Sequence, residues 1–370
     1  MQNTQKDQAV SGQAERKQHI RLLSLDAFRG FTILGMLIVN NLALDTYTPR
    51  ILMHADWSGG ITFADMVFPW FLFIVGVAIP YSAASHKAKN LEPWKYDLKV
   101  IRRTIWLIAL GFLVDSSIAQ KPTFELGIGL AYMVGALLYN LKLHIRIALA
   151  AALLLIYWAM IRFIPIPGAG AGHFTENQNL IKHINEAYLK PYHLKGAFST
   201  IPTSALVIIG SIFGDITQMK NWSAKHKTIW IIGCGIGLAL IGFIWSLDLP
   251  FNKPVWTPSY ILFSAGLGAL VMGVFFAITD YAGVKKWAFP LVVFGSNAIL
   301  AYVLPIITKA FILQSWTVPP TKLTIQQYLL NLLKSYAGPI AGGWLYTLIY
   351  IALWWIVLLQ LYKNKIFLRI

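Results

Sequence analysis

Apolar residues recur along most of this chain in long runs, which short polar segments separate. A helix needs about 20 apolar residues to cross the hydrocarbon core of a bilayer, and uninterrupted runs of that length are typical of membrane-spanning helices. Ten runs meet this description and predict an all-α, polytopic transmembrane helix bundle with about ten helices. They lie at 29–46, 61–84, 99–118, 124–141, 145–164, 199–216, 228–247, 257–280, 288–313 and 340–362.

The segments between these runs are short, with few exceptions. Residues 1–20 are polar and lack the apolar stretch of a signal peptide, so we expect a disordered cytoplasmic tail, followed by a transmembrane domain over 21–370. The two longest connections, 165–198 and 314–339, contain Pro and Gly and short amphipathic stretches. They predict surface helices that either connect two spans or cover an outward-facing cavity.

Composition supports the membrane class: 57% of the residues are hydrophobic and 12% are charged, against about 25% charged in soluble domains. The net charge of +16 could indicate a nucleic-acid partner, but the charges lie in short clusters between apolar runs. Of the 31 Lys and Arg residues, 21 fall in the tail, at the C-terminus, in the segments after every second predicted span, and in the first residues of the spans that follow the tail or these segments. The positive-inside rule therefore predicts cytoplasmic N- and C-termini and excludes nucleic acid as the reason for the charge.

Several familiar signals of chemistry are missing from the sequence. It contains no phosphate-binding loop motif, and its eight His and 15 acidic residues show no spacing typical of a metal site. The single cysteine, Cys234, lies inside an apolar run, where a packing role is expected. We therefore expect neither a bound metal nor an intrachain disulfide.

One group of polar residues gathers where the first predicted span ends and the second begins. His54, Asp56 and Trp57 lie in the connecting loop, Asn40 lies late in the first span, and Asp65 opens the second. A carboxylate beside an imidazole fixes its tautomer and raises its basicity, as a general base requires. An amide could bond neighbouring helices or stabilise an oxyanion. Because a loop histidine is otherwise a surface residue, both interpretations stay open.

Ionisable and polar residues also occur inside or at the ends of other predicted spans. Arg29 follows Asp26 by three positions, so the two side chains can pair on one helix face. This pair either anchors the helix or leaves the arginine available to an anionic ligand. Asn297 and Tyr302 in the ninth span either line a polar core or bond across helices.

A third polar group precedes the eighth span. Asn252 and Lys253 stand close to Trp256, a combination that suits a sugar, because amide and amine groups bond hydroxyls and an indole stacks on the ring face. An interfacial aromatic belt would explain the tryptophan equally well.

Taken together, these motifs resemble the heparan-alpha-glucosaminide N-acetyltransferase family of transmembrane acyltransferases, in its compact bacterial branch. The resemblance runs in order from about residue 21 to the ninth span. The matching positions are Ser24 to Gly30, Val39-Asn40, His54 to Trp57, Ala64 to Trp70, Arg103, Ser199 to Pro202, Asn252-Lys253, Ser259-Tyr260, Asn297 to Ile299 and Tyr302.

The resemblance implies transfer of an acetyl group from cytoplasmic acetyl-CoA to the amine of a glucosamine-type sugar on the other side of the membrane. It implies an amino-sugar or glycan acceptor, surrounding membrane lipid and a bacterial inner membrane; a homo-oligomer stays open. The expected catalytic residues are His54, Asp65 and Asn40. The residues expected to bind acetyl-CoA are Arg29, Arg102, Arg103, Asn297 and Tyr302, and those expected to bind the acceptor are Trp57, Asn252, Lys253 and Trp256.

Three alternatives to this function remain at the level of sequence. An O-acyltransferase acting on a surface glycan would use the same donor. An amino-sugar or oligosaccharide transporter would show internal repeats with broken spans, and we find no convincing repeat between the halves. A non-catalytic membrane subunit would leave His54 as a surface residue. Direct transfer and a route through acetyl-His54 also stay open.

Overall fold

Helices make up most of the computed structural model, which describes residues 22–57, 60–90, 92–120, 127–192, 194 and 196–368. The predicted tail at 1–20 lies outside these ranges. The α-helices are α2 (Leu23–Asn41), α3 (Phe63–Lys87), α4 (Pro93–Ala119), α5 (Gly127–Leu137), α6 (Leu143–Phe163), α7 (Leu180–Ile184), α8 (Thr200–Gln218), α9 (Ala224–Trp245), α10 (Pro258–Phe276), α11 (Phe289–Ser296), α12 (Ala298–Thr308), α13 (Ile325–Ala337) and α14 (Pro339–Lys363).

Short elements connect or extend these helices. Two strands, β1 (Thr317–Val318) and β2 (Leu323–Thr324), pair antiparallel. The 3-10 and π-helical turns are η1 (Asp45–Tyr47), η2 (Arg50–Leu52), η3 (Leu138–Asn140), η4 (Asn185–Leu189), η5 (Lys190–Tyr192), η6 (Ala197–Ser199), η7 (Ala277–Tyr281), η8 (Lys286–Ala288) and η9 (Lys309–Leu313). The surface helices expected in the two long connections are present as α7 and α13.

Seven helices in the described ranges are long and apolar enough to cross a membrane, and the bent pair α11–α12 would make an eighth. The seven are Leu23–Asn41, Phe63–Lys87, Leu143–Phe163, Ala197–Gln218, Ala224–Trp245, Pro258–Tyr281 and Pro339–Lys363. The polytopic all-α fold is thus present. The count of ten, and the orientation, remain predictions.

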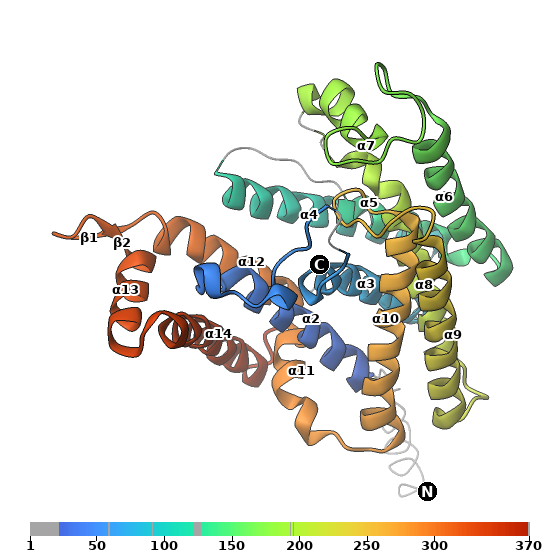
Figure 1. Cartoon of the computed structure of the whole chain (residues 1–370). Helices are drawn as coiled ribbons and strands as arrows, with labels where there is room; N and C mark the ends of the chain where they lie inside the picture. The colour runs from blue at the N-terminus through green and yellow to red at the C-terminus, as the bar shows by residue number, and fades with distance from the viewer. Residues whose placement is uncertain are drawn as a thin grey trace, which may run out of the picture.

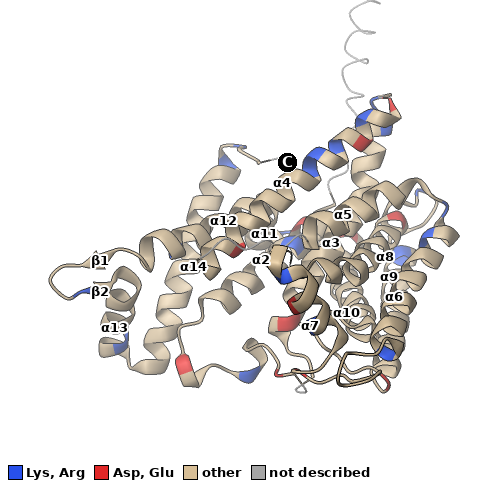
Figure 2. Ribbon diagram, turned by 90° about the horizontal axis from the view of Figure 1, so that it is seen from above, with Lys and Arg blue, Asp and Glu red and all other residues tan. Residues whose placement is uncertain are grey.

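Two of the ten predicted spans fall short of these requirements for physical reasons. The helix Gly127–Asn140 is apolar but short. Helix α4 carries Lys95, Lys99, Arg102 and Arg103 in its first half, which leaves too short an apolar stretch behind them. Figure 2 shows these basic residues as blue bands along the start of α4.

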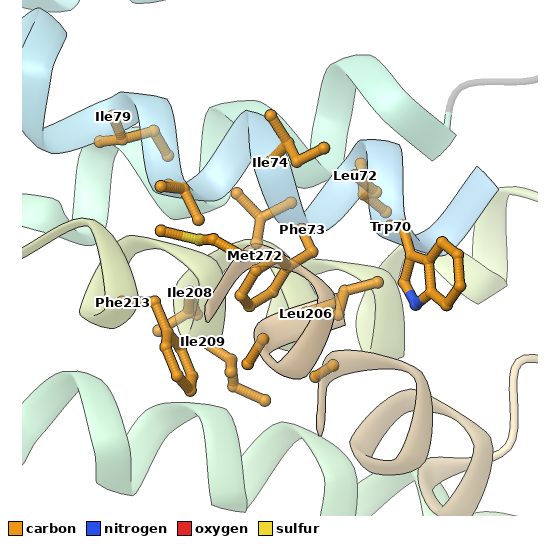
Figure 3. Packing of buried hydrophobic residues seen from close by; sticks show 14 of the residues in the cluster. Trp70, Leu72, Phe73, Ile74, Ile79, Leu206, Ile208, Ile209, Phe213 and Met272 are labelled. Carbon is orange, nitrogen blue, oxygen red and sulfur yellow. The ribbon is translucent and has the colours of Figure 1, made fainter. Parts of the chain in front are cut away.

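Helices α2 and α3 lie in the middle of the molecule. Figure 1 shows α6, α8, α9 and α10 on one side of them and α12, α13 and α14 on the other, and Figure 2 agrees. Helix α3 packs against α8, α2 against α11, and α10 against α9. The largest cluster of buried apolar side chains joins α3, α8 and α10, with Phe73, Leu206 and Met272 among its members (Figure 3).

Close approach between α3 and α8 depends on glycine. A Cβ atom added at Gly210 would collide with the carbonyl oxygen of Phe73, and one at Gly76 would collide with that of Val207. Small residues at a contact let two membrane helices approach until their backbones touch, so that dispersion contacts hold them together. This contact fixes α3, the helix that opens with Asp65.

The ninth predicted span, 288–313, is two helices that meet at a bend of 65°. Asn297 lies between them with φ −126° and ψ 46°. Its side-chain nitrogen donates to the carbonyl of Ile366 at 2.8 Å, and its oxygen accepts from the amide of Leu368 at 3.0 Å. The buried amide therefore holds the C-terminal segment against the break.

Segments that the predicted topology places on the same side of the membrane contact one another in the structure. On the expected outer side, Lys334 pairs with Asp45 at 2.6 Å, and the Lys309 amine donates to the carbonyl of Asn40 at 2.7 Å. On the expected inner side, the amide of Ser24 donates to Asp280 at 3.3 Å. These contacts join segments that the prediction assigns to the same side, and the orientation itself stays a prediction.

One buried ion pair stabilises the bundle away from the polar cluster. Arg146 of α6 is 5% exposed and pairs with Asp215 of α8, and it also donates to the hydroxyl of Ser211 at 3.0 Å. Tyr139 donates to the other oxygen of Asp215 at 3.0 Å. Arg146, which lies at the start of the fifth predicted span, therefore links two helices.

Candidate active site

The cluster around His54 is built on the first turn of α3. Thr62 precedes the helix, and its amide donates to Oδ2 of Asp65 at 3.2 Å. The amide of Ala55 donates to the same oxygen at 3.0 Å. This arrangement satisfies amides that a helix start leaves without partners, and it fixes the loop above the helix against Asp65, whose side chain is 3% exposed.

The other carboxylate oxygen of Asp65 contacts His54. The distance from Oδ1 to Nδ1 of the imidazole is 2.8 Å. An ionised carboxylate can only accept, so Nδ1 carries the hydrogen and Nε2 keeps its lone pair. The imidazole is 57% exposed, while its partner is buried. A group arranged in this way can accept a proton from an incoming ligand.

A second charged group reaches the same pair from the loop between α9 and α10. Nζ of Lys253 lies 3.2 Å from Nδ1 of His54 and 3.6 Å from Oδ1 of Asp65. It also donates to the carbonyl of Ala64 at 3.4 Å. Burial lowers the pKa of Lys253 below its ordinary value, and the neighbouring carboxylate opposes that shift in part. The sequence suggested only that this lysine would contact a sugar.

Asn252 joins the two loops of the site. Its side-chain nitrogen donates to the carbonyl of Trp57 at 3.3 Å, and its oxygen accepts from the amide of Val255 at 3.0 Å. The residue is 3% exposed. Both polar ends of this amide are thus in use within the protein, while the ring of Trp57 packs on Phe174 with centroids 5.2 Å apart.

A cavity of about 500 Å³ opens beside this loop, between α3, α4, α8 and α12. Much of its wall is apolar, and Ser199, Asn185 and Tyr302 add polar groups. Trp256 closes one part of it, with its ring 5.7 Å from that of Phe68. Pro254 also lines the cavity. The cavity therefore extends to Pro254, the residue that follows Lys253. Lys253 in turn contacts His54.

The basic residues expected to bind acetyl-CoA lie on α2 and α4. Arg29 pairs with Asp26 at 3.1 Å, as the spacing predicted. Arg103 stacks over the ring of Tyr132 at 4.7 Å. Its Nε is buried and has no hydrogen-bond partner among the described residues. Arg102 beside it is exposed.

Helix α4 carries both Arg103 and part of the cavity wall. Leu107, one turn after Arg103, lines the cavity. Asn297, also expected at the donor site, is bonded to the C-terminal segment instead, and its role in binding stays a prediction.

Asn40, the third expected catalytic residue, lies at the end of α2 and is exposed. Its backbone carbonyl accepts from Lys309. Within the described residues, no hydrogen bond joins its side chain to His54. The structure thus brings together two of the three expected catalytic residues, and the oxyanion role of Asn40 stays a prediction.

Sequence reasoning missed Thr62 as a site residue, and it missed the contact of Lys253, an expected acceptor-binding residue, with His54. Thr62 begins α3 and bonds Asp65, and the pattern Thr-x-x-Asp before an apolar run is a recognisable helix-start signal. The contact of Lys253 with His54 had no comparable signal, because 199 positions separate the two residues.

Comparison with known proteins finds a family model and two curated relatives. A family model described as a domain of unknown function (DUF5009) matches residues 21–120, which include His54 and Asp65. Human heparan-alpha-glucosaminide N-acetyltransferase is 24% identical over an alignment of 427 positions, gaps included, which covers 95% of this chain and 60% of the human protein. The mouse protein of the same name is 22% identical over an alignment of 433 positions, which covers 97% of this chain and 62% of the mouse protein.

The chain thus spans about three fifths of the length of the curated relatives it matches. The similarity extends over nearly all of this chain, and both relatives carry the same name. The chain is therefore related, at the level of the family, to the heparan-alpha-glucosaminide N-acetyltransferases.

Proposed function

We propose that this protein is a membrane-embedded acetyltransferase. In this proposal it moves acetyl from cytoplasmic acetyl-CoA to the amine of a glucosamine-type sugar on the non-cytoplasmic side. The observation that carries the proposal is the 2.8 Å hydrogen bond between His54 and Asp65, in a chain whose curated relatives are N-acetyltransferases.

His54 acts as the general base in this reaction. Its Nε2 takes a proton from the sugar amine while the amine nitrogen attacks the thioester carbonyl and forms the C–N bond. The C–S bond then breaks, and the departing thiolate takes the proton back from the imidazolium. Asp65 holds the imidazole in the reactive tautomer and stabilises its charged form.

The cavity and the arginines of α4 suit the donor. An apolar cavity of about 500 Å³ can take the long uncharged arm of acetyl-CoA. Arg102 and Arg103 offer guanidinium groups, which bind phosphates through paired hydrogen bonds, and Arg29 on α2 offers a third. The free Nε of Arg103 supports an anionic partner at this place.

The developing oxyanion needs a donor, and we assign this to Asn40. Its side chain is exposed at the end of α2, so the assignment requires that the bound thioester reach this position. One such donor contributes about 3 kcal/mol to transition-state stabilisation. Trp57 and Trp256 offer aromatic faces to the acceptor sugar, and Asn252 holds the first of these in place through its carbonyl.

Product analysis tests the proposal. Purified protein is incubated with acetyl-CoA labelled in the acetyl group and with either glucosamine or N-acetylglucosamine, which keeps the hydroxyls but has no free amine. We expect a labelled amide from glucosamine and no labelled product from N-acetylglucosamine. A labelled ester from both sugars would instead identify an O-acyltransferase, and no transfer to either by folded protein would contradict the proposal.

A further inference from the structure

Helix α3 contains a proline one turn after Asp65. In an α-helix each backbone N–H donates to the carbonyl four residues earlier, so the carbonyl of Asp65 would accept from residue 69. That residue is Pro69, which has no N–H, and a proline ring also crowds the carbonyl four positions before it. The helix therefore cannot form the regular bond to the carbonyl of Asp65, the residue whose carboxylate contacts His54.

A side chain from another helix supplies a donor at this place. The hydroxyl of Tyr260, in the first turn of α10, donates to the carbonyl of Asp65 at 2.5 Å. Tyr260 is fully buried, and so is this bond. Because a buried carbonyl without a partner costs free energy, the tyrosine makes up for the amide hydrogen that Pro69 lacks.

A second bond between α3 and α10 keeps Tyr260 in register with Asp65. Nε1 of Trp70, the residue after Pro69, donates to the carbonyl of Ser264 at 3.2 Å. Ser264 lies one turn after Tyr260 on α10. Each helix thus donates one buried hydrogen bond to a backbone carbonyl of the other, and the two bonds together fix the start of α3 against α10.

The same turn of α10 holds the loop that carries Lys253. The hydroxyl of Ser259 donates to the carbonyl of Leu249, near the start of that loop, at 2.7 Å. Tyr260, the next residue, bonds α3 instead. One turn of α10 therefore connects the loop of Lys253 to the helix start that carries Asp65.

We propose that Tyr260 is a positioning residue: its hydroxyl replaces the hydrogen bond that Pro69 removes from the start of α3, and it thereby holds the Asp65 carboxylate in place. Since the hydroxyl bonds a backbone oxygen, Tyr260 acts on His54 only through Asp65. The effect of Tyr260 on acetyl transfer rests on the proposed function; its effect on the start of α3 does not.

A double-mutant cycle tests the proposal. Tyr260→Phe removes the hydroxyl and keeps the ring, so the Asp65 carbonyl loses this donor. Pro69→Ala returns an amide N–H at the position from which a helix normally bonds that carbonyl. If the two residues serve one carbonyl, Pro69→Ala should improve the Tyr260→Phe protein more than the wild-type protein, whereas independent residues would give additive effects.

Hydrogen–deuterium exchange of the whole protein in detergent, followed by mass spectrometry, measures the site without any substrate. The amides of Ala55 and Thr62 donate to Oδ2 of Asp65, so their exchange reports whether the carboxylate stays in place. We expect their exchange to be about tenfold faster in Tyr260→Phe, as an unpaired buried carbonyl implies. The double variant should return towards the wild-type rate.

Tyr350→Phe is the matched control. The hydroxyl of Tyr350 is also buried and donates to a backbone carbonyl, that of Pro305, at 2.6 Å. This carbonyl keeps a second bond from the amide of Lys309. Exchange at Ala55 and Thr62 should therefore match the wild-type protein.

Two results would overturn the inference. One is wild-type exchange at Ala55 and Thr62 in Tyr260→Phe. The other is an equal effect of Pro69→Ala in the presence and absence of the Tyr260 hydroxyl. If Tyr260→Phe fails to fold, the double variant decides, because the proposal requires that its new amide restore folding.

The exchange measurement needs no acetyl-CoA, so its failure is distinguishable from failure of the proposed function. Where transfer is measured, Tyr260→Phe should lower kcat with a smaller effect on the acceptor KM, and the double variant should regain kcat. A wild-type kcat in Tyr260→Phe would contradict a positioning role for this tyrosine.

Discussion

Asp65 performs two tasks with its two carboxylate oxygens. Oδ2 accepts from the amides of Ala55 and Thr62 at the start of α3, and Oδ1 accepts from His54. The first task fixes the carboxylate so rigidly that the second has a defined geometry. A helix start thus supplies the orientation that a catalytic histidine requires.

Asp65→Asn removes the negative charge but keeps the size of the side chain. An asparagine can turn its NH₂ group towards Nδ1, which would then accept, and Nε2 would carry the hydrogen instead. We expect acetyl transfer to fall by about 10³-fold or more, while the weaker helix start costs about 1 kcal/mol. Initial rates at saturating acetyl-CoA measure the first effect, and thermal unfolding in detergent measures the second.

The control is Asp45→Asn, which removes a carboxylate paired with Lys334 on the same expected side. It should retain the wild-type rate. An Asp65→Asn variant with unchanged transfer would show that the tautomer of His54 does not matter.

Asn252 gives a stability test at the same scale. Asn252→Ala leaves the Trp57 carbonyl and the Val255 amide without their partner. Unpaired buried polar groups cost about 2 kcal/mol, so the midpoint of thermal unfolding in detergent should fall. Asn177→Ala, at an exposed position, should leave the midpoint unchanged. Equal midpoints for the two variants would show that Asn252 does not hold the loops together.

Among the elements, long apolar runs predicted most helices well, because lipid-facing and buried positions are both apolar. The run at 61–84 became α3, and the run at 340–362 became α14. The bend at Asn297 was not predictable from hydropathy. It depends on hydrogen bonds to Ile366 and Leu368, which a local pattern does not contain.

Helix contact between α3 and α8 leads to a prediction about Gly210. Gly210→Leu would drive a side chain into the backbone of Phe73, and overpacking of this kind costs at least about 1–3 kcal/mol. We expect the thermal midpoint to fall and aggregates to appear in size-exclusion chromatography. Gly237→Leu in α9 provides the matched control, since a Cβ there meets open space; similar behaviour of both variants would contradict the packing account.

At the scale of the whole molecule, the sequence placed His54 and Asp65 at the same boundary of the predicted bundle and left their pairing as one of two interpretations; the structure pairs them. The sequence did not predict the approach of Lys253, nor the cavity between α3, α4, α8 and α12. Both depend on how helices distant in sequence pack together. A local sequence pattern can indicate which residues belong to such a site, but their arrangement depends on how the helices pack.

The predicted orientation can be tested with single cysteines in a Cys234→Ala background. The positive-inside rule places Lys285 on the cytoplasmic side and Lys182 on the opposite side. Lys285→Cys should react with an impermeant maleimide only from the cytoplasmic face of sealed vesicles, and Lys182→Cys only from the other face. Reaction of both from one face would contradict the alternation of the spans.

The most direct test of the account places donor and acceptor on opposite sides of a membrane. Proteoliposomes are loaded with glucosamine, acetyl-CoA labelled in the acetyl group is added outside, and the lumen is analysed by mass spectrometry. The account predicts labelled N-acetylglucosamine in the lumen with wild-type protein and none with His54→Gln. Equal product with His54→Gln, or product only when both substrates share one compartment, would contradict it.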